Sequence, residues 1–273
     1  MIRRHPKIRL TEAERDMMRA ACQFNAEVLD FARPHVREGV TTGEIDRIIH
    51  EYTLDHGHVP ACLGYPGEKF PFPNSCCISV NDVICHGIPG DYVLQAGDIA
   101  NVDLTSIVDG WHGDQSETFL IGPAESISDE ARKVTQCAFD CLYLGIEATS
   151  PGCRVSVIGE AIVDHVGRNY GFGVVDKYVG HGIGTQFHQR PNIPHVPSPQ
   201  SRRERLQPGM CFTIEPMING GTLHSTCDRS DGWTVRTQDG RLSAQFEHTI
   251  LMTEDGPEIL TGTQAGPKPG FKF

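Results

Sequence analysis

Apolar side chains at helical spacing fill the first part of the chain. Thr11 and Glu14 form a capping-box pattern, after which the spacing predicts a helix to about Val36. Thr41 and Glu44 repeat the pattern ahead of a second helix. Its apolar face consists of Ile45, Ile48, Ile49 and Tyr52. The chain therefore opens with two amphipathic helices.

The same series of elements starts again past the middle of the chain. Residues 64–73 are rich in Gly, Pro and Phe, as in a loop, and short β-type runs follow to about Leu120. Ser128 is placed to cap a third helix and Ser156 a fourth, and strands resume near Val174. Aligning Gly39 with Gly152 also brings Ile45 onto Ile158 and Ile49 onto Ile162. The pattern predicts an α+β fold of two pseudo-symmetric halves that close around a shared cleft.

This pattern also divides the chain. A basic N-terminal arm, residues 1–10, precedes a single domain over residues 11–260. The two halves of that domain are about 11–122 and 123–260. Residues 261–273 hold several Gly and Pro and are expected to form a poorly ordered C-terminal tail.

Composition narrows the class of protein. The chain has 273 residues, 38% of them hydrophobic, which is enough for a sizeable core without disulfides. Its 24 basic and 35 acidic side chains give a formal net charge of -11, so no nucleic acid substrate is expected. The sequence contains neither an apolar run long enough to cross a membrane nor the apolar segment of a secretory signal. A cytoplasmic protein without membrane association is expected.

The chain is also rich in cysteine. Its ten cysteines are spread along the sequence with no CxxC pair, which excludes a zinc ribbon. In a chain of this size and in a reducing compartment, we expect them to be reduced and mostly buried as small hydrophobic side chains. Their number alone therefore predicts no disulfide scaffold.

Two aspartates share a predicted β-hairpin. Its turn signal is Asp109-Gly110, and if those residues form the loop, Asp114 faces Thr105 across the hairpin. Asp103 then points to the same face. Diagonal neighbours lie roughly 7 Å apart at the backbone, which suits two carboxylates that share a pair of cations. Exposed Asp is common, however, so the hairpin alone does not distinguish a metal site from a solvated surface.

Three further segments hold polar side chains among glycines or apolar residues. VGHGIGTQFH places His181 between glycines that let the backbone approach a ligand closely, with His188 following. CFTIEPM is a β-type run with Glu215 at its edge. In QFEHTI, strand alternation puts Gln245 and Glu247 on one face. Each segment alone has an ordinary structural explanation, but an unpaired carboxylate among apolar neighbours is costly to bury.

These residues belong to a series of blocks that resembles a known family. The blocks are ACLGYPG, NDVICHGIPG, GDIANVDLT, GWHGDQSETF, VGHGIG, FTIEPM and SAQFEHTI. In order and content they resemble the type I methionine aminopeptidases, metallopeptidases of the pita-bread fold, and the match extends from about Thr11 to Leu260. The resemblance implies two divalent metal ions, of Co, Mn, Fe or Zn. Their ligands would be Asp103, Asp114, His181, Glu215 and Glu247.

The resemblance implies how these ligands share the ions. Asp114 and Glu247 would bridge both ions. Asp103 would complete the ligands of one ion, and His181 with Glu215 those of the other. A water shared by the ions would become the hydroxide that attacks the peptide carbonyl after the N-terminal residue.

The resemblance also implies roles for residues beside the metals. Glu215 would act as the general acid and base, and His86 and His188 would hydrogen-bond the scissile peptide. A core histidine is the alternative explanation for each imidazole. A pocket for the methionine side chain would be lined by Cys62, Tyr65, Cys77, Phe187 and Trp233. Ordinary core packing is a stronger alternative for these five residues than for the metal ligands.

The chain departs from the family pattern in two places. The loop GYPGEKFPFPN, residues 64–74, is a few residues longer than in short family members. The aromatic residue that the family places there is either Phe70 or Phe72. After His188 the chain has Gln189 and Arg190, where acidic residues are common in the family.

The sequence thus predicts a methionyl aminopeptidase, a hydrolase that removes the N-terminal methionine of nascent proteins and peptides and prefers a small second residue. An Xaa-Pro aminopeptidase or prolidase of the same fold is the nearest alternative, and a non-catalytic protein-binding module is another. The compact HGIGTQFH block and the lack of a large N-terminal domain favour methionine removal over the first alternative, which shares the five ligands. The full ligand set argues against the second, because non-catalytic relatives are expected to have lost ligands. A monomer is expected, and a transient contact with the ribosome is left open.

Overall fold

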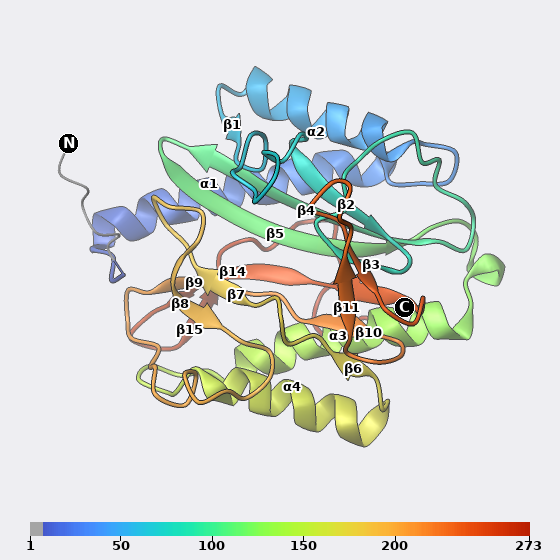
Figure 1. Ribbon diagram of the computed structural model, residues 1–273. Helices are drawn as coiled ribbons and strands as arrows, with labels where there is room; N and C mark the ends of the chain where they lie inside the picture. Colours follow the sequence, from blue (N-terminus) through green and yellow to red (C-terminus); the bar gives the residue numbers. More distant parts are fainter. Residues whose placement is uncertain (1–7) are drawn as a thin grey trace.

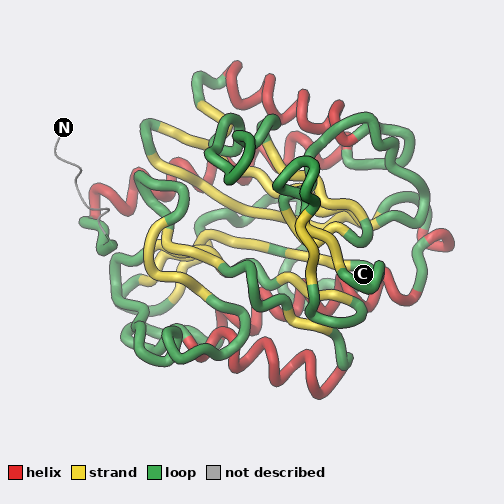
Figure 2. The backbone as a smooth tube through the Cα atoms, in the orientation of Figure 1, coloured by secondary structure: helices red, strands yellow, loops and turns green. Residues whose placement is uncertain are grey.

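Two pairs of helices flank the strands. The computed structural model describes residues 8–273, so most of the expected basic arm lies outside the described residues. Helices α1 and α2 lie in the upper half of Figure 1 and α3 and α4 in the lower half, with the strands between them (Figure 2). The helices are α1 Glu12–Ala32, α2 Thr42–Asp55, α3 Asp129–Glu147 and α4 Ser156–Asn169, with short 3-10 helices η1 Arg33–His35 and η2 Ala124–Ser126. Within residues 8–273, none is long and apolar enough to cross a membrane.

The first two helices begin as the sequence predicts. At α1, the Thr11 backbone N–H donates to the Glu14 carboxylate at 2.7 Å, as in a capping box. At α2, the Glu44 backbone N–H donates to the Thr41 hydroxyl at 3.1 Å. These bonds satisfy donors that the first turn of a helix leaves free.

Of the two caps predicted for the third and fourth helices, one is confirmed. Ser128 caps α3, where its hydroxyl accepts from the Ala131 backbone N–H at 3.1 Å. The prediction that Ser156 caps α4 is wrong, because Val155 already has helical backbone angles and Ser156 is the first residue of the helix. Ser156 is buried there.

The strands form one large sheet and two small ones. The large sheet has the order β1-β4-β5-β14-β9-β7-β8, with β2 also paired to β4 and β15 to β14. The small sheets are β13-β10-β6 and β11-β12-β3. The bounds are β1 Val59–Pro60, β2 Cys76–Val80, β3 Val83–Cys85, β4 Ile99–Val108, β5 Trp111–Leu120, β6 Gly173–Val174, β7 Gly180–Gly182, β8 Gln189–Ile193, β9 Cys211–Ile214, β10 Met217–Asn219, β11 Ser225–Cys227, β12 Val235–Thr237, β13 Ser243–Gln245, β14 Glu247–Met252 and β15 Pro257–Ile259.

The long hairpin of β4 and β5 has the predicted register. Asp109 and Gly110 form its turn with φ of 49° and 83°, the left-handed angles that a tight hairpin needs. Thr105 pairs with Asp114 across the two strands, as predicted. The turn therefore sets which face of the sheet each acidic side chain occupies.

The two helix pairs pack on separate hydrophobic cores. Ile45 of α2 is buried in the first core, and Ile158 of α4 is buried in the second. Gly39 and Gly152 lead into these helices with φ of 82° and 81°. The parallel is consistent with an internal duplication, which stays a prediction.

The end of the chain differs from expectation. Residues 261–273 contain no helix or strand, but Thr261 is fully buried. The Phe273 ring lies 5.4 Å from the Phe139 ring and 5.6 Å from the Phe246 ring, between centroids. The expectation of a poorly ordered tail is therefore wrong, because the aromatic end of the chain covers the second core.

Candidate metal centre

Polar side chains from five separate parts of the chain line one cavity of about 330 Å³. Among them are all five metal ligands that the sequence resemblance implies: Asp103, Asp114, His181, Glu215 and Glu247. They lie on β4, on β5, on β7, directly after β9 and at the start of β14. These five strands are consecutive in the large sheet, in the order β4-β5-β14-β9-β7 (Figure 1).

The register of the sheet aligns three of the carboxylates. Asp103 of β4 and Glu247 of β14 both pair with Ser116 of β5, one from each side. Asp114 lies two residues before Ser116 on the same strand, so it points to the same face. Three adjacent strands therefore each direct a carboxylate into the cavity.

The imidazole of the cluster lies close to two of its carboxylates. His181 Nε2 lies 3.5 Å from Asp114 Oδ2 and 3.6 Å from Glu215 Oε1. One ligand atom each of Asp114, His181 and Glu247 lie within 4.8 Å of one another. A single cation between them could contact all three side chains.

The backbone of β7 fixes the direction of the imidazole. His181 Nδ1 lies 3.1 Å from the Gly182 carbonyl oxygen, which leaves Nε2 facing the carboxylates. A Cβ at Gly182 would lie 2.2 Å from the Arg190 carbonyl oxygen, so only glycine permits β8 to approach here. The glycines around His181 therefore serve the close packing of strands.

Hydrogen bonds hold the carboxylates in place. The Thr105 hydroxyl donates to Asp114 Oδ1 at 2.7 Å, and the Thr213 hydroxyl donates to Glu215 Oε1 at 2.8 Å. Gln245 Nε2 donates to Glu215 Oε2 at 3.3 Å. The sequence did not identify these donors as functional, although the hairpin register already placed Thr105 opposite Asp114. Strand alternation was the available signal for Thr213 and Gln245.

Crowding and burial disfavour the charged forms of the carboxyl groups. Burial, followed by the charge of Asp114, raises the pKa of Asp103 and of Glu247 well above their ordinary values. Burial also raises the pKa of Glu215 to about 7, although His181 opposes the shift. Burial alone would lower the pKa of His181, but Asp114 and Glu215 outweigh it and raise the pKa.

This donor set suits divalent cations. Carboxylate oxygens and one imidazole are ligands that Mn, Fe, Co and Zn ions accept. Four acidic side chains in one buried cavity also repel one another, and bound cations would offset that charge. The residues present therefore fit a metal cofactor.

The two predicted non-ligand histidines line the same cavity. Burial lowers the pKa of His86 to about 4 and that of His188 to about 3, so both rings are neutral at neutral pH. The Tyr65 hydroxyl lies 2.8 Å from His188 Nδ1. His86 has a φ of 56°, an uncommon backbone angle for a residue with a side chain.

An aromatic and sulfur-containing wall adjoins the acidic cluster. The predicted pocket residues Cys62, Tyr65, Cys77, Phe187 and Trp233 all line the cavity and pack together. Phe72 joins them, buried and with its ring 5.2 Å from that of Trp233, whereas Phe70 is 57% exposed. The structure therefore places Phe72 in the wall and Phe70 on the surface.

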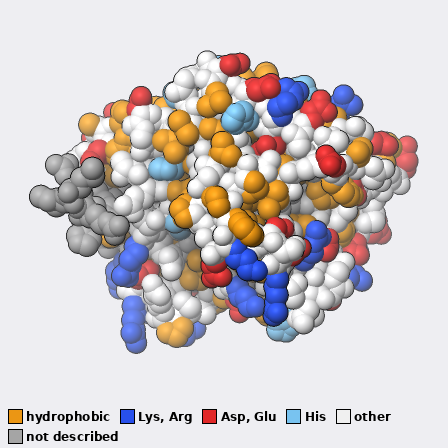
Figure 3. Space-filling model, turned by 45° about the horizontal axis from the view of Figure 1, so that its top comes forward, with side chains coloured by type: hydrophobic (Ala, Val, Ile, Leu, Met, Phe, Trp, Pro, Cys, Tyr) orange, Lys and Arg blue, Asp and Glu red, His pale blue; other side chains and the backbone are white. Residues whose placement is uncertain are grey.

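Gln189 and Arg190, which stand where acidic residues are common in the family, make their contacts outside the cavity. Arg190 forms an ion pair with Glu204, and Gln189 Nε2 donates to the Ile183 carbonyl oxygen at 3.4 Å. Neither side chain lines the cavity. On the face shown in Figure 3, hydrophobic side chains gather near the middle, with charged side chains around them.

Comparison with known proteins gives consistent matches. Residues 16–254 match the profile of metallopeptidase family M24. Methionine aminopeptidase A of Synechocystis sp. is 51% identical over 253 residues, which span 92% of this chain and 96% of that protein. The methionine aminopeptidase of Escherichia coli is 46% identical over 253 residues and is covered to 92%, as is this chain.

Solved structures agree with these matches. The crystal structure of methionine aminopeptidase from Rickettsia prowazekii superposes with a TM-score of 0.87 at 42% identity, covering 93% of this chain and 99% of that chain. Prolidase from Pyrococcus furiosus superposes with a TM-score of 0.72 at 20% identity, over 94% of this chain and 66% of that chain. The second likeness shows a shared fold only.

Proposed function

Because the chain belongs to metallopeptidase family M24 and, within it, to the methionine aminopeptidases, we propose that it removes the N-terminal methionine from proteins and peptides. Membership of the family implies a divalent metal cofactor and protein N-termini as substrates. The observation that carries the proposal is one cavity that joins an acidic cluster to an aromatic and sulfur-containing wall.

The proposal places two divalent ions, of Co, Mn, Fe or Zn, in the cavity. Asp114 and Glu247 would be ligands to both ions, since they face the cavity from neighbouring strands. Asp103 would complete the ligands of one ion. His181 and Glu215 would complete the ligands of the other ion, in keeping with the 3.6 Å between His181 Nε2 and Glu215 Oε1. When bound, such a pair supplies a water that loses its proton near neutral pH.

Glu215 is the residue to which we assign proton transfer. Its carboxyl lines the cavity in which that water would be held, the position that a general acid and base requires. Hydrogen bonds from Thr213 and Gln245 fix its position. Glu215 would take the proton of the attacking water and pass it to the departing amine.

His86 and His188 would bind the scissile peptide. Each ring is neutral at neutral pH, so it carries one N–H that can donate to a carbonyl oxygen. If Tyr65 donates to His188 Nδ1, the proton of that ring is on Nε2. The donors would stabilise negative charge that develops on the carbonyl oxygen.

The wall beside the cluster would hold the methionine side chain. Sulfur–aromatic contacts contribute about 0.3–1.5 kcal/mol each, and Tyr65, Phe72, Phe187 and Trp233 offer such rings. Cys62 and Cys77 add two polarizable sulfur atoms. The proposal includes a preference for a small second residue, which rates for Met-Gly and Met-Leu peptides would measure.

The substrate also suggests where the protein acts. Nascent chains carry the initiator methionine, so we place the protein in the cytoplasm, acting as a monomer and in transient contact with the ribosome. Co-sedimentation with ribosomes tests that contact, and ultracentrifugation of the purified chain tests the monomer.

Two peptides decide between methionine removal and the nearest alternative. After removal of metal with a chelator, the full chain should be inactive, and Mn or Co ions should restore cleavage of a Met-Gly peptide. An Xaa-Pro peptide should remain uncut under the same conditions. Cleavage of the Xaa-Pro peptide alone would favour the prolidase alternative. Activity that survives chelation would contradict a metal-dependent mechanism.

A further inference from the structure

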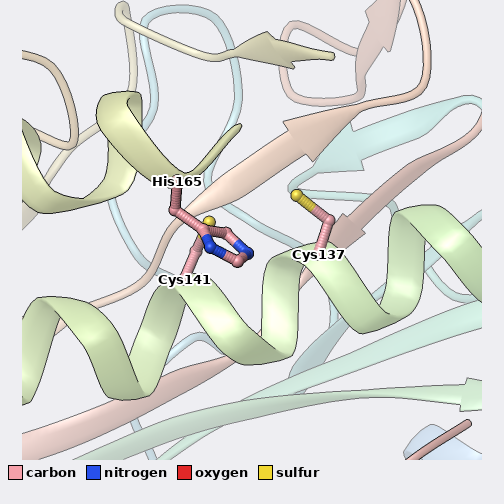
Figure 4. A group of neighbouring side chains, drawn as sticks. All are labelled: Cys137, Cys141 and His165. Carbon is pink, nitrogen blue, oxygen red and sulfur yellow. The ribbon is translucent and has the colours of Figure 1, made fainter. Parts of the chain in front are cut away.

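A second cluster of metal-binding side chains lies between α3 and α4. Cys137 and Cys141 are one turn apart on α3, and the His165 ring of α4 reaches toward them (Figure 4). Their two Sγ atoms and one ring nitrogen all lie within 4.8 Å of one another. None of the three residues lines the candidate metal centre.

The cluster leaves a buried polar atom without a partner. His165 Nε2 is shielded from solvent and has no hydrogen-bond partner among residues 8–273. On the other side of the ring, Nδ1 lies 3.2 Å from Asn169 Nδ2. Cys137 and Cys141 are both fully buried. Buried polar atoms are nearly always satisfied, so an unpartnered nitrogen beside two thiols needs an explanation.

We propose that Cys137, Cys141 and His165 bind a soft or borderline metal ion, such as Zn²⁺ or Cd²⁺. Two thiolates and one imidazole are a ligand set that these ions prefer. Bonds of about 2.3 Å to sulfur and about 2.0 Å to nitrogen place tetrahedral ligand atoms roughly 3.5–3.8 Å apart. The three atoms already lie within 4.8 Å of one another, so we expect side-chain rotation on metal binding to close the remaining distance.

The surroundings offer a fourth ligand and a route to solvent. Asp140 Oδ2 lies 4.0 Å from His165 Nε2, and the two side chains are 22% and 20% exposed. Gln136 Nε2 donates to the other Asp140 oxygen at 2.7 Å. Asp140 or a water could therefore complete a tetrahedral site, which the partly open edge makes accessible.

This position defines what the metal would do. The ligands come from two helices, so the ion would link α3 to α4 in the core of the second half. It would support the fold rather than contact a peptide, because the cluster is separate from the cavity that we propose as the active site. The two sites also differ chemically, since thiolates are absent from the proposed ligands of the first.

Thiolate charge-transfer absorption distinguishes the two sites. The full chain is reduced, stripped of metal and titrated with Cd²⁺ or Co²⁺ while thiolate-to-metal bands are recorded. We expect saturable bands in the wild-type protein and their loss in the Cys137→Ser/Cys141→Ser double variant. His165→Ala, which keeps both thiols, should weaken binding by about tenfold or more.

A matched pair of cysteines provides the control. Cys62 and Cys77 lie near the candidate metal centre, and the Cys62→Ser/Cys77→Ser variant should keep the bands. Circular dichroism checks the fold, and the His165→Ala titration decides if the Cys137 and Cys141 double variant does not fold. The proposal is wrong if wild type shows no band, if the band survives loss of Cys137 and Cys141, if it needs Cys62 and Cys77, or if His165→Ala binds as tightly as wild type.

Discussion

The acidic side chains of the cavity are costly to bury in their charged form. Asp103, Asp114, Glu215 and Glu247 line one buried space, where each carboxylate disfavours the charge of the others. Burying a carboxylate without a partner is unfavourable, so such a cluster implies a compensating positive charge. Sequence motifs identified these four residues, but the burial and crowding that raise the pKa values of Asp103, Glu215 and Glu247 are properties of the folded chain.

The Asp114→Asn variant tests the centre of this cluster. The change removes a shared ligand, so we expect metal-dependent hydrolysis of a Met-Gly peptide to fall at least about a hundredfold. In the metal-free protein it also relieves repulsion from Asp103 and Glu247, so the midpoint of thermal unfolding should not decrease.

The same hairpin offers a control for that variant. Asp109→Asn makes the same chemical change at the exposed turn, where Asn tolerates the φ of 49°. Its activity and metal affinity, measured by calorimetry, should match wild type. Full activity in Asp114→Asn would remove Asp114 from the site.

At the scale of single elements, local signals predicted the starts of α1, α2 and α3 and the register of the β4–β5 hairpin. A cap or a tight turn depends on a few neighbouring residues, which is why these predictions are confirmed. The cap of α4 was predicted wrongly. Val155 already has helical backbone angles, so Ser156 is the first residue of the helix, where its side chain is buried. The tail was also misjudged, since its order comes from contacts with Phe139 and Phe246 that lie far away in sequence.

Close packing between α1 and β5 gives a prediction at this scale. A Cβ at Gly113 would lie 2.4 Å from the Ala21 carbonyl oxygen in α1. Gly113→Ala should therefore push the helix from the strand and lower the free energy of unfolding by about 1–3 kcal/mol. Urea denaturation measures this change.

A glycine in open space gives the matched control. Gly167 lies in α4 with nothing within 4 Å of an added Cβ. Gly167→Ala should leave stability unchanged or raise it by up to about 1 kcal/mol, because alanine favours the helix. Equal effects of the two substitutions would contradict a steric role for Gly113.

At the scale of the whole molecule, the resemblance to the type I methionine aminopeptidases and the expected fold class are confirmed by relatives and structures that cover nearly all of the chain. The proposed metal site forms only when the two halves of the domain pack together, because its five ligands come from both halves. The assignment of each ligand to an ion stays a proposal.

Buried histidines make the stability of the whole molecule depend on pH. Burial lowers the pKa of His86 and His248 to about 4, and that of His188 and His195 to about 3. An unfolded histidine has a pKa of about 6.5, so below that pH the unfolded chain binds protons that the folded chain does not. The contribution of these four histidines to the free energy of unfolding should therefore be largest above about pH 6.5 and fall as the pH drops toward 4. In the metal-free protein, the raised pKa values of Asp103, Glu215 and Glu247 act in the opposite direction.

One substitution isolates part of this effect. In metal-free protein, His86→Asn should raise the free energy of unfolding at about pH 5, relative to that at about pH 7.5, by about 1–2 kcal/mol compared with wild type. Asn suits the φ of 56° at this position. His224→Gln, on an exposed loop, should leave the pH dependence as in wild type. Urea denaturation at the two pH values checks both, and an unchanged slope in His86→Asn would contradict the role of its burial.

The sequence by itself determined the helices and the hairpin, through caps, turns and alternation that act over a few residues, and its ordered motifs identified the family. Only the tertiary structure decided which distant groups meet. It selected Phe72 over Phe70 for the pocket wall, placed Thr213 and Gln245 on Glu215, and brought His165 to two cysteines of another helix. These contacts join residues whose separation in sequence carries no periodic signal, and they form only when strands and helices pack.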